Sequence, residues 1–301
     1  MKTTLLFLAA GVGSRYGGLK QLDQFGPNGE TLMEYSLYDG IHAGFDKIIF
    51  VIRKDFENEF KNAFIDKIKD RIEVDYVFQE LSAIPHGYEV PAERSKPWGT
   101  GHAILVANSK IDGPFAVLNA DDFYGRQAYQ IIHDFLVGLN EGDDKTYSIV
   151  GYPLAQTLSA HGAVSRGVCK TDQQGNLIKI TERTKIARSK DGIYYEEDGR
   201  SFSLAEDTLV SMNLMGFTPT FFDYLEKYFK EFLDQSLNDH KAEFLLPAVV
   251  NELVTTGQVK VKVLPTNAQW FGVTYQEDRP LVMERINKLM AEESYPNKLW
   301  S

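Results

Sequence analysis

Two cationic side chains stand in a glycine-rich segment near the start of the chain. The segment AAGVGSRYGGLK holds four glycines together with Arg15 and Lys20, and it follows the apolar run 3–9. A glycine turn after a buried strand lets backbone N–H groups reach a phosphate. Arg15 and Lys20 carry more positive charge than a diphosphate bridge requires. The segment therefore predicts a phosphate site, and a triphosphate would use its charge.

The spacing of this segment fits neither of two common phosphate-binding motifs. In the dinucleotide fingerprint a third glycine is required where this chain has Tyr16, and the next strand, DKIIFVIRKD, ends in basic residues. The P-loop requires lysine directly after glycine, but Leu19 separates Gly18 from Lys20. An NAD-dependent oxidoreductase is therefore the weakest of the functional alternatives.

Composition indicates a folded chain with a large core. Of its 301 residues 43% are hydrophobic, and the formal net charge of -10 argues against a general nucleic-acid surface. The single cysteine, Cys169, excludes an internal disulfide framework and is expected to pack in a strand. No apolar run reaches membrane-spanning length, so we expect a cytoplasmic protein without a membrane partner.

Apolar periodicity predicts strands alternating with helices in the first half of the chain. The second half adds a hairpin about a Gly-Asn turn at 166–183 and a strand at 208–217. This order indicates an α/β fold with a single Rossmann-like, doubly wound mixed sheet and a small antiparallel element in the second half. Expected strands are 3–9, 46–53, 73–79, 114–120, 146–152 and 259–264, and expected helices are 30–44, 56–68, 102–109, 128–139, 219–235, 243–257 and 278–294.

Polar residues at the carboxyl ends of the parallel strands are the candidates for chemistry. Ligands of open α/β sheets bind beyond these strand ends. In this chain the ends are Gly11–Lys20, Gln79 with Glu80, and Asn119–Asp122. No linker or repeat interrupts the pattern, so we expect one domain, 1–301.

Several motifs resemble those of the sugar-1-phosphate nucleotidyltransferases. LAAGVGSR with Lys20 is similar to their signature loop, and VFQE, GTGHA, LNADD, ITER and MNLMGF follow in the same order from residue 3 to about 280. The local likeness is greatest to N-acetylglucosamine-1-phosphate uridylyltransferases. The resemblance implies the GT-A-like nucleotidyltransferase fold, Mg²⁺ as cofactor, and a nucleoside triphosphate, UTP above others, with a sugar-1-phosphate as substrates.

The resemblance also implies a nucleotide-binding half, 1–155, and a sugar-phosphate-binding half, 156–301. It further implies roles for particular residues. Arg15, Lys20 and Asp121 are the expected catalytic residues, with Asp121 holding the metal. Gly167, Glu182 and Asn213 are expected to bind the sugar phosphate. The residues expected to bind the nucleotide are Leu8, Ala10, Gly11, Gly13, Ser14, Gln79, Gly99, Thr100 and Gly101.

The chemistry of such a transfer suits these residue types. A sugar phosphate oxygen is already ionised when it attacks the α-phosphorus, so no general base is needed. No Ser-His-Asp or Cys-His arrangement is recognisable in the sequence, which agrees with this. Charge building on the leaving pyrophosphate requires cations, which Arg15, Lys20 and a metal on Asp121 would supply.

Some positions depart from the family pattern and leave alternatives open. Arg183 stands where many relatives have lysine, and Thr274 stands at an expected second metal-ligand position, with Asp278 as a substitute. The insertion 81–98 would be a lid or an oligomer contact, so a homo-oligomer is one option. Cytidylyl transfer to phosphocholine, guanylyl transfer to a sugar phosphate and a catalytically silent sugar-nucleotide sensor are the other options.

Overall fold

Four parallel strands form the first part of the central sheet. The computed structural model describes residues 2–11, 20–140, 142–273, 275–292 and 294–300. The parallel strands lie in the order β3 (Glu73–Phe78), β2 (Lys47–Ile52), β1 (Thr4–Leu8) and β4 (Phe115–Asn119). β1, β2 and β4 are buried along most of their length because helices cover both faces of the sheet. The predicted doubly wound sheet is confirmed.

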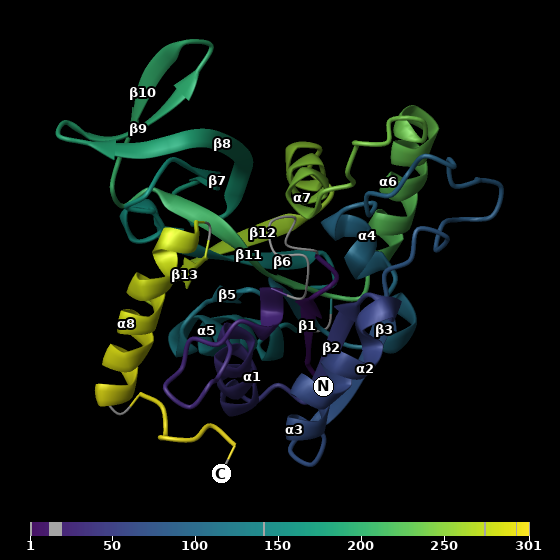
Figure 1. Cartoon of the computed structure of the whole chain (residues 1–301). Coiled ribbons are helices and arrows are strands. Elements are labelled where there is room, and N and C mark those ends of the chain that lie inside the picture. Colours follow the sequence, from purple (N-terminus) through teal and green to yellow (C-terminus); the bar gives the residue numbers. More distant parts are fainter. Residues whose placement is uncertain (1, 12–19, 141, 274, 293, 301) are drawn as a thin grey trace.

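Antiparallel strands complete the sheet and extend from it. β11 (Leu209–Phe217) pairs with β4 and, along its other edge, with β6 (Thr146–Pro153), which is parallel to β12 (Lys260–Pro265). An arm, β7–β10, projects at the upper left of Figure 1. It consists of β7 (Val164–Thr171), β8 (Leu177–Ser189), β9 (Gly192–Glu197) and β10 (Arg200–Leu204). The short strands β5 (Asp122–Phe123) and β13 (Phe271–Gly272) form a separate sheet.

The sheet forks at β11. Val210 and Ser211 pair with β7, whereas Met215 to Phe217 pair with β4 along the same edge of β11. Asn213 lies between these two stretches with φ of 65°, in the left-handed region that asparagine tolerates better than most residues. The register with β6 shifts at the same place. The fork therefore separates the carboxyl end of β4 from the base of the arm.

Helices cover the two faces of the sheet with separate apolar clusters. Leu5 and Phe7 of β1 face one cluster, and Leu6 faces the other, because successive side chains of a strand point to opposite faces. The first cluster is covered by α1 (Leu32–Ala43), α2 (Glu57–Phe60), η3 (Lys61–Ile65), α3 (Asp66–Ile68) and α5 (Arg126–Val137). The second is covered by α4 (Thr100–Leu105), α6 (Phe221–Ser236) and α7 (Leu246–Thr255). In the described chain, no helix is long and apolar enough to cross a membrane.

Three predicted helices differ from the structure in detail. The helix expected at 56–68 is broken by the π-turn Lys61–Ile65, whose wider turn suits the four-residue spacing of buried Phe60, Phe64 and Ile68. The helix expected at 102–109 begins at Thr100 and ends at Leu105. α6 begins at Phe221, so Pro219 precedes its N-cap instead of standing in the first turn. The last helix, α8 (Arg279–Ala291), packs against β5 and β13 through a third apolar cluster.

The insertion 81–98 is fixed to the body of the protein. Arg94, only 4% exposed, donates hydrogen bonds to the carbonyl groups of Asp239 and Ala242 in the α6–α7 connection. Its guanidinium lies 3.6 Å from the ring centroid of Trp98, which is fully buried. Trp98 Nε1 in turn donates to the carbonyl oxygen of Leu81 at 2.9 Å. These contacts hold both ends of the insertion together.

We predict that Arg94→Ala will loosen this insertion. The substitution leaves buried carbonyl groups without donors and removes the stack on Trp98, which should lower the free energy of unfolding by about 2–4 kcal/mol. Hydrogen exchange should become faster across 81–98. Lys96→Ala is the matched control, because Lys96 makes an exposed ion pair with Glu243 and should change stability by less than about 1 kcal/mol. Equal effects of both substitutions would contradict this role of Arg94.

Candidate active site

The ends of three parallel strands converge at one edge of the sheet. Ala120 N donates to Leu8 O at the end of β1, and Gln79 N donates to Ile52 O at the end of β2. These hydrogen bonds continue the parallel pairing by one residue beyond the strands. Ala10, Gln79 and Asp121 are thereby brought to the carboxyl edge of the sheet, where open α/β sheets bind ligands.

The first residues of the glycine segment are anchored by Gln21. Its Nε2 donates to Ala9 O at 3.4 Å and to Gly11 O at 3.3 Å, and only 6% of the residue is exposed. Among the described residues, no heavy atom lies within 4 Å of the ideal Cβ position of Gly11, so none of their packing contacts requires a glycine there. Sequence analysis missed Gln21, because an amide after the loop carries no distinguishing pattern.

Several predicted loop residues fall outside the described chain. Gly13, Ser14 and Arg15 belong to the segment 12–19, and their expected roles stay predictions. Lys20 is the first residue of the 3-10 helix η1 (Lys20–Leu22).

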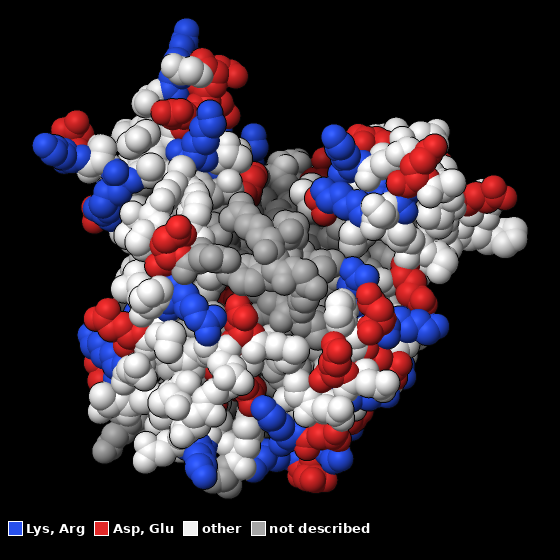
Figure 2. All heavy atoms as spheres, in the orientation of Figure 1, with Lys and Arg blue, Asp and Glu red and all other residues white. Residues whose placement is uncertain are grey.

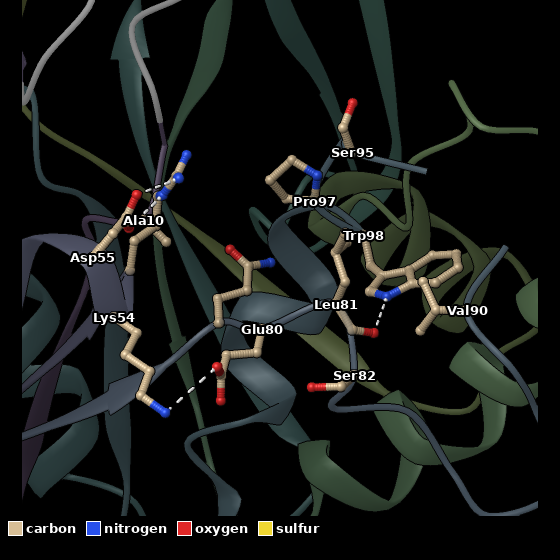
Figure 3. A pocket seen from close by; sticks show the side chains of 12 residues that line it. Ala10, Lys54, Asp55, Glu80, Leu81, Ser82, Val90, Ser95, Pro97 and Trp98 are labelled. Atoms are coloured by element: carbon tan, nitrogen blue, oxygen red, sulfur yellow. Dashed lines mark hydrogen bonds and ion pairs between the residues drawn. The ribbon is translucent and has the colours of Figure 1, made fainter. Parts of the chain in front are cut away.

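A cavity of about 520 Å³ lies between the strand ends and the insertion. Figure 3 shows Trp98, Val90 and Leu81 on one side of it and Lys54 and Asp55 on the other. Ala10 and Gln79 also line it. The lining combines these apolar side chains with charged and polar ones, Arg53 and Glu80 among them. Concave sites with convergent polar groups are typical of small-molecule binding. The insertion therefore supplies one wall of a candidate ligand site.

The amide of Gln79 is held by two acceptors. Its Nε2 donates to Gly99 O at 3.0 Å and contacts His102 Nδ1 at 3.3 Å. His102 Nε2 lies 2.7 Å from Ala83 O, and the ring is fully buried. Burial lowers the pKa of His102 and favours its neutral form. His102 thus contacts the Gln79 side chain but has no exposed surface for a ligand.

The three residues Gly99 to Gly101 pack against the start of α7. Gly99 has φ of 110°, and a Cβ there would lie 2.5 Å from Phe244 O. A Cβ at Gly101 would lie 2.6 Å from Phe244 Cδ1, and Thr100 Oγ1 accepts a hydrogen bond from Leu246 N. Packing alone therefore accounts for both glycines. Their binding of a nucleotide stays a prediction.

Asp121 and Asp122 follow β4 in different settings. Asp122 Oδ2 accepts a hydrogen bond from Asn119 Nδ2 at 3.0 Å, and its backbone pairs with Gly272 in β5–β13. Asp121 lies in the turn between β4 and β5, half-buried, beside a cavity of about 10 Å³ that Gln21 also lines. Asp122 therefore positions the start of β5. The metal-binding role of Asp121 stays a prediction from the family resemblance.

The residues near Asp121 fit a magnesium ion that keeps most of its ligands from phosphate and water. Among the described residues no group of three or more His, Cys, Asp or Glu forms a ready metal cage. Asp278 Oδ1 accepts from Ser159 Oγ and Oδ2 from Tyr275 N, so this buried carboxylate holds its own turn. Thr274 lies outside the described residues. One carboxylate plus phosphate oxygens is a common magnesium arrangement.

The predicted sugar-phosphate residues lie on neighbouring strands beyond the fork. Gly167 of β7 stands opposite Glu182 of β8 on one side and Ser211 of β11 on the other. Asn213 follows two residues later at the fork. Glu182 is exposed, and partial desolvation raises the pKa of its carboxyl group. The structure thus brings these residues together on neighbouring strands.

Two arginines near Glu182 make different contacts. Arg166 is 8% exposed, donates to Thr157 O and Ser165 O, and lies 4.8 Å from the ring centroid of Trp270. Burial lowers its pKa to about 10, while the Asp122 and Glu182 charges oppose this shift. Sequence analysis missed Arg166, because only the fold brings it near these carboxylates. Arg183, which stands where many relatives have lysine, pairs with Glu197 of the arm.

Charged side chains of both signs cover the outer surface around the site. On the face drawn in Figure 2, Lys and Arg are interspersed with Asp and Glu over the arm and the lower half. Among the described residues of this face, positive charge is therefore dispersed and does not form a broad basic surface.

Solved structures with the same fold cover nearly the whole chain. The structure of a UDP-glucose pyrophosphorylase complexed with UDP-glucose is 17% identical, with a TM-score of 0.62 over 96% of this chain and 99% of that one. A putative glucose-1-phosphate thymidylyltransferase from Bacillus anthracis is 12% identical, with a TM-score of 0.64 over 99% and 98%. The inositol-1-phosphate CTP transferase from T. maritima is 13% identical, with a TM-score of 0.60 over 95% and 96%. These likenesses confirm the expected fold.

Family membership follows from the sequence match. Among individually curated proteins none matches the chain. The family profile described as nucleotidyl transferase, however, matches residues 6–273, which include the glycine segment, both aspartates after β4 and the strands of the fork. This confirms the resemblance found in the sequence motifs. The chain belongs to the nucleotidyl transferase family and is an enzyme of that type.

Proposed function

We propose that this enzyme transfers a nucleotide from a nucleoside triphosphate, UTP above others, to a sugar-1-phosphate. The observation that carries the proposal is the fork at β11. On one side lie residues 9–11 and the cavity beside Gln79, and on the other lie Gly167 and Glu182, with Asp121 at the end of β4. The names of the three structural neighbours combine a nucleotide with glucose or with the 1-phosphate of glucose or inositol. They support such an acceptor.

The proposed reaction is an in-line displacement at phosphorus. An oxygen of the sugar phosphate bonds to the α-phosphorus, and the bond from that phosphorus to the pyrophosphate oxygen breaks. Since the attacking oxygen is already ionised, no side chain has to remove a proton. Arg15 and Lys20 would neutralise the leaving pyrophosphate, and Glu182 would orient the sugar through its hydroxyl groups. Mg²⁺ held by Asp121 would supply additional positive charge at the phosphates.

Pyrophosphate release from the purified protein with Mg²⁺ tests the proposal. UTP, dTTP, CTP and GTP are each combined with a set of sugar-1-phosphates and with phosphocholine. We expect release to require one sugar-1-phosphate and to be fastest with UTP. Release with phosphocholine alone would contradict the proposed acceptor and identify phosphocholine in its place. Tight binding of a nucleotide sugar without any release would contradict catalysis and favour a sensor.

We predict that Asp121→Asn will reduce turnover at least about a hundredfold, because charge held by a metal contributes several kcal/mol in the transition state. The Mg²⁺ concentration for half-maximal rate should rise as well, while the thermal midpoint of unfolding should change little. Asp122→Asn is the control: it weakens the contact with Asn119 and should affect stability more than the Mg²⁺ requirement. Near wild-type turnover of Asp121→Asn would remove Asp121 from this role.

We predict that Glu182→Gln will raise KM for the sugar-1-phosphate by about tenfold or more, because a hydrogen bond to a charged group contributes about 1.5–3 kcal/mol. KM for the nucleotide should stay within about twofold, since Glu182 lies on the arm side of the fork. Glu196→Gln, at an exposed arm position, is the matched control and should leave both constants unchanged. An equal rise in both KM values would argue against separate half-sites.

A further inference from the structure

The pairing of β4 with β11 stops before β4 itself ends. The last paired residues at this end are Val117 of β4 and Met215 of β11. Further along, Ala120 N donates to Leu8 O of β1. Because the N–H groups of successive strand residues point to opposite edges, the N–H of Asn119 points to the β11 side. The fork therefore leaves an N–H group of β4 facing the edge from which β11 has turned away.

The hydroxyl group of Tyr124 takes the place of the missing strand partner. Asn119 N donates to Tyr124 Oη at 3.1 Å, and Oη donates to Met212 O of β11 at 2.8 Å. Asp122 Oδ2 lies farther from the same hydroxyl, at 3.5 Å. Burial holds the pKa of Tyr124 well above its ordinary value, so the group keeps its hydrogen. One side-chain oxygen thus bridges β4 and β11 where their backbone pairing has ended.

Packing fixes the ring that carries this bridge. Tyr124 directly follows β5, is fully buried and belongs to the first apolar cluster. The ring centroids of Tyr129 and Tyr152 lie 6.2 Å and 6.5 Å from its own. Tyr152 Oη donates to Tyr124 O at 2.9 Å. In a close-packed interior a ring held from several sides cannot move without displacing its neighbours, so the bridge is rigid.

The bridge joins the two branches of the candidate site. Asp121 lies on the β4 branch, two residues beyond one end of the bridge. At the other end, Met212 directly follows Ser211, which pairs with Gly167 of β7. Glu182 of β8 stands opposite Gly167. The length of the bridge therefore sets how far the β4 branch stands from the arm branch.

We propose that Tyr124 is a positioning residue whose hydroxyl bridge sets the spacing at which the two substrates of the proposed reaction meet. The inference rests on the proposed function and adds to it a fully buried residue that touches neither substrate. Reacting atoms must lie about 3–3.5 Å apart, and a misplacement of about 1 Å can cost about a hundredfold in rate. Half-sites on different strands reach that precision only if the strands are fixed relative to each other.

Tyr124→Phe removes the bridging oxygen and keeps the ring. Asn119 N and Met212 O then lose a shared partner, so the branches shift or admit water. In pyrophosphate release, kcat should fall about tenfold or more, while KM for each substrate should stay within about threefold, because each half-site lies on one branch. An unchanged kcat, or a loss confined to KM, would overturn the inference.

Tyr147→Phe is the matched control, because it removes a hydroxyl group from another fully buried tyrosine. Tyr147 belongs to the second apolar cluster, on the opposite face of the sheet, and its Oη lies 2.9 Å from Thr220 Oγ1. This variant should also lose thermal stability, but its kcat should stay within about twofold of wild type. An equal loss of kcat in both variants would reduce Tyr124 to a structural role and overturn the inference.

Amide hydrogen exchange tests the bridge without any substrate. In the wild-type protein the N–H of Asn119 should be protected like that of Ala120, and in Tyr124→Phe it should exchange about tenfold or more faster while Ala120 changes less. Rapid exchange at Asn119 in the wild-type protein would overturn the bridge, even if Tyr124→Phe did not fold. Absence of pyrophosphate release from the wild-type protein would instead count against the proposed function, and would leave the exchange result unaffected.

Discussion

The pairing of β11 with two different strands along one edge determines the layout of the site. β4 takes the last residues of β11 and β7 takes residues 210 and 211, so the edge opens between them. Asn213 makes this possible because its left-handed backbone permits the local change of register. Asp121 at the end of β4 and Glu182 on β8 consequently lie on the two branches of one fork. In the proposed reaction the two branches would hold one substrate each, with the reacting phosphates meeting between them.

The nucleotide side of the fork depends on buried polar contacts as much as on the sheet. The cavity wall formed by the insertion is held by Arg94, whose cost of burial is offset by carbonyl acceptors and by the ring of Trp98. The same insertion supplies the carbonyl group that orients His102 and thus Gln79. The packing of this insertion and the orientation of the Gln79 amide are therefore coupled.

The sequence was sufficient for the fold class and for most elements, because continuous apolar runs and caps such as Gly44 are local signals. It was sufficient also for the family, through motifs that are contiguous in the chain. Arg166 and the Ala83–His102–Gln79 contacts could not be predicted, since they join residues from different elements and depend on the packed structure. The strands β9 and β10 were missed as well. Only Ile193 and Tyr195 of these two short strands are buried, so the pair offers little apolar signal in the sequence.

The crystal structure of the enzyme with the nucleotide sugar that it forms is the most direct test of the two-sided site. The account predicts that the base lies in the cavity beside Gln79 and Trp98. The sugar should lie across the fork, within hydrogen-bond distance of Glu182. A nucleotide sugar bound with its base on the arm side, or with both parts on one branch of the fork, would contradict the account.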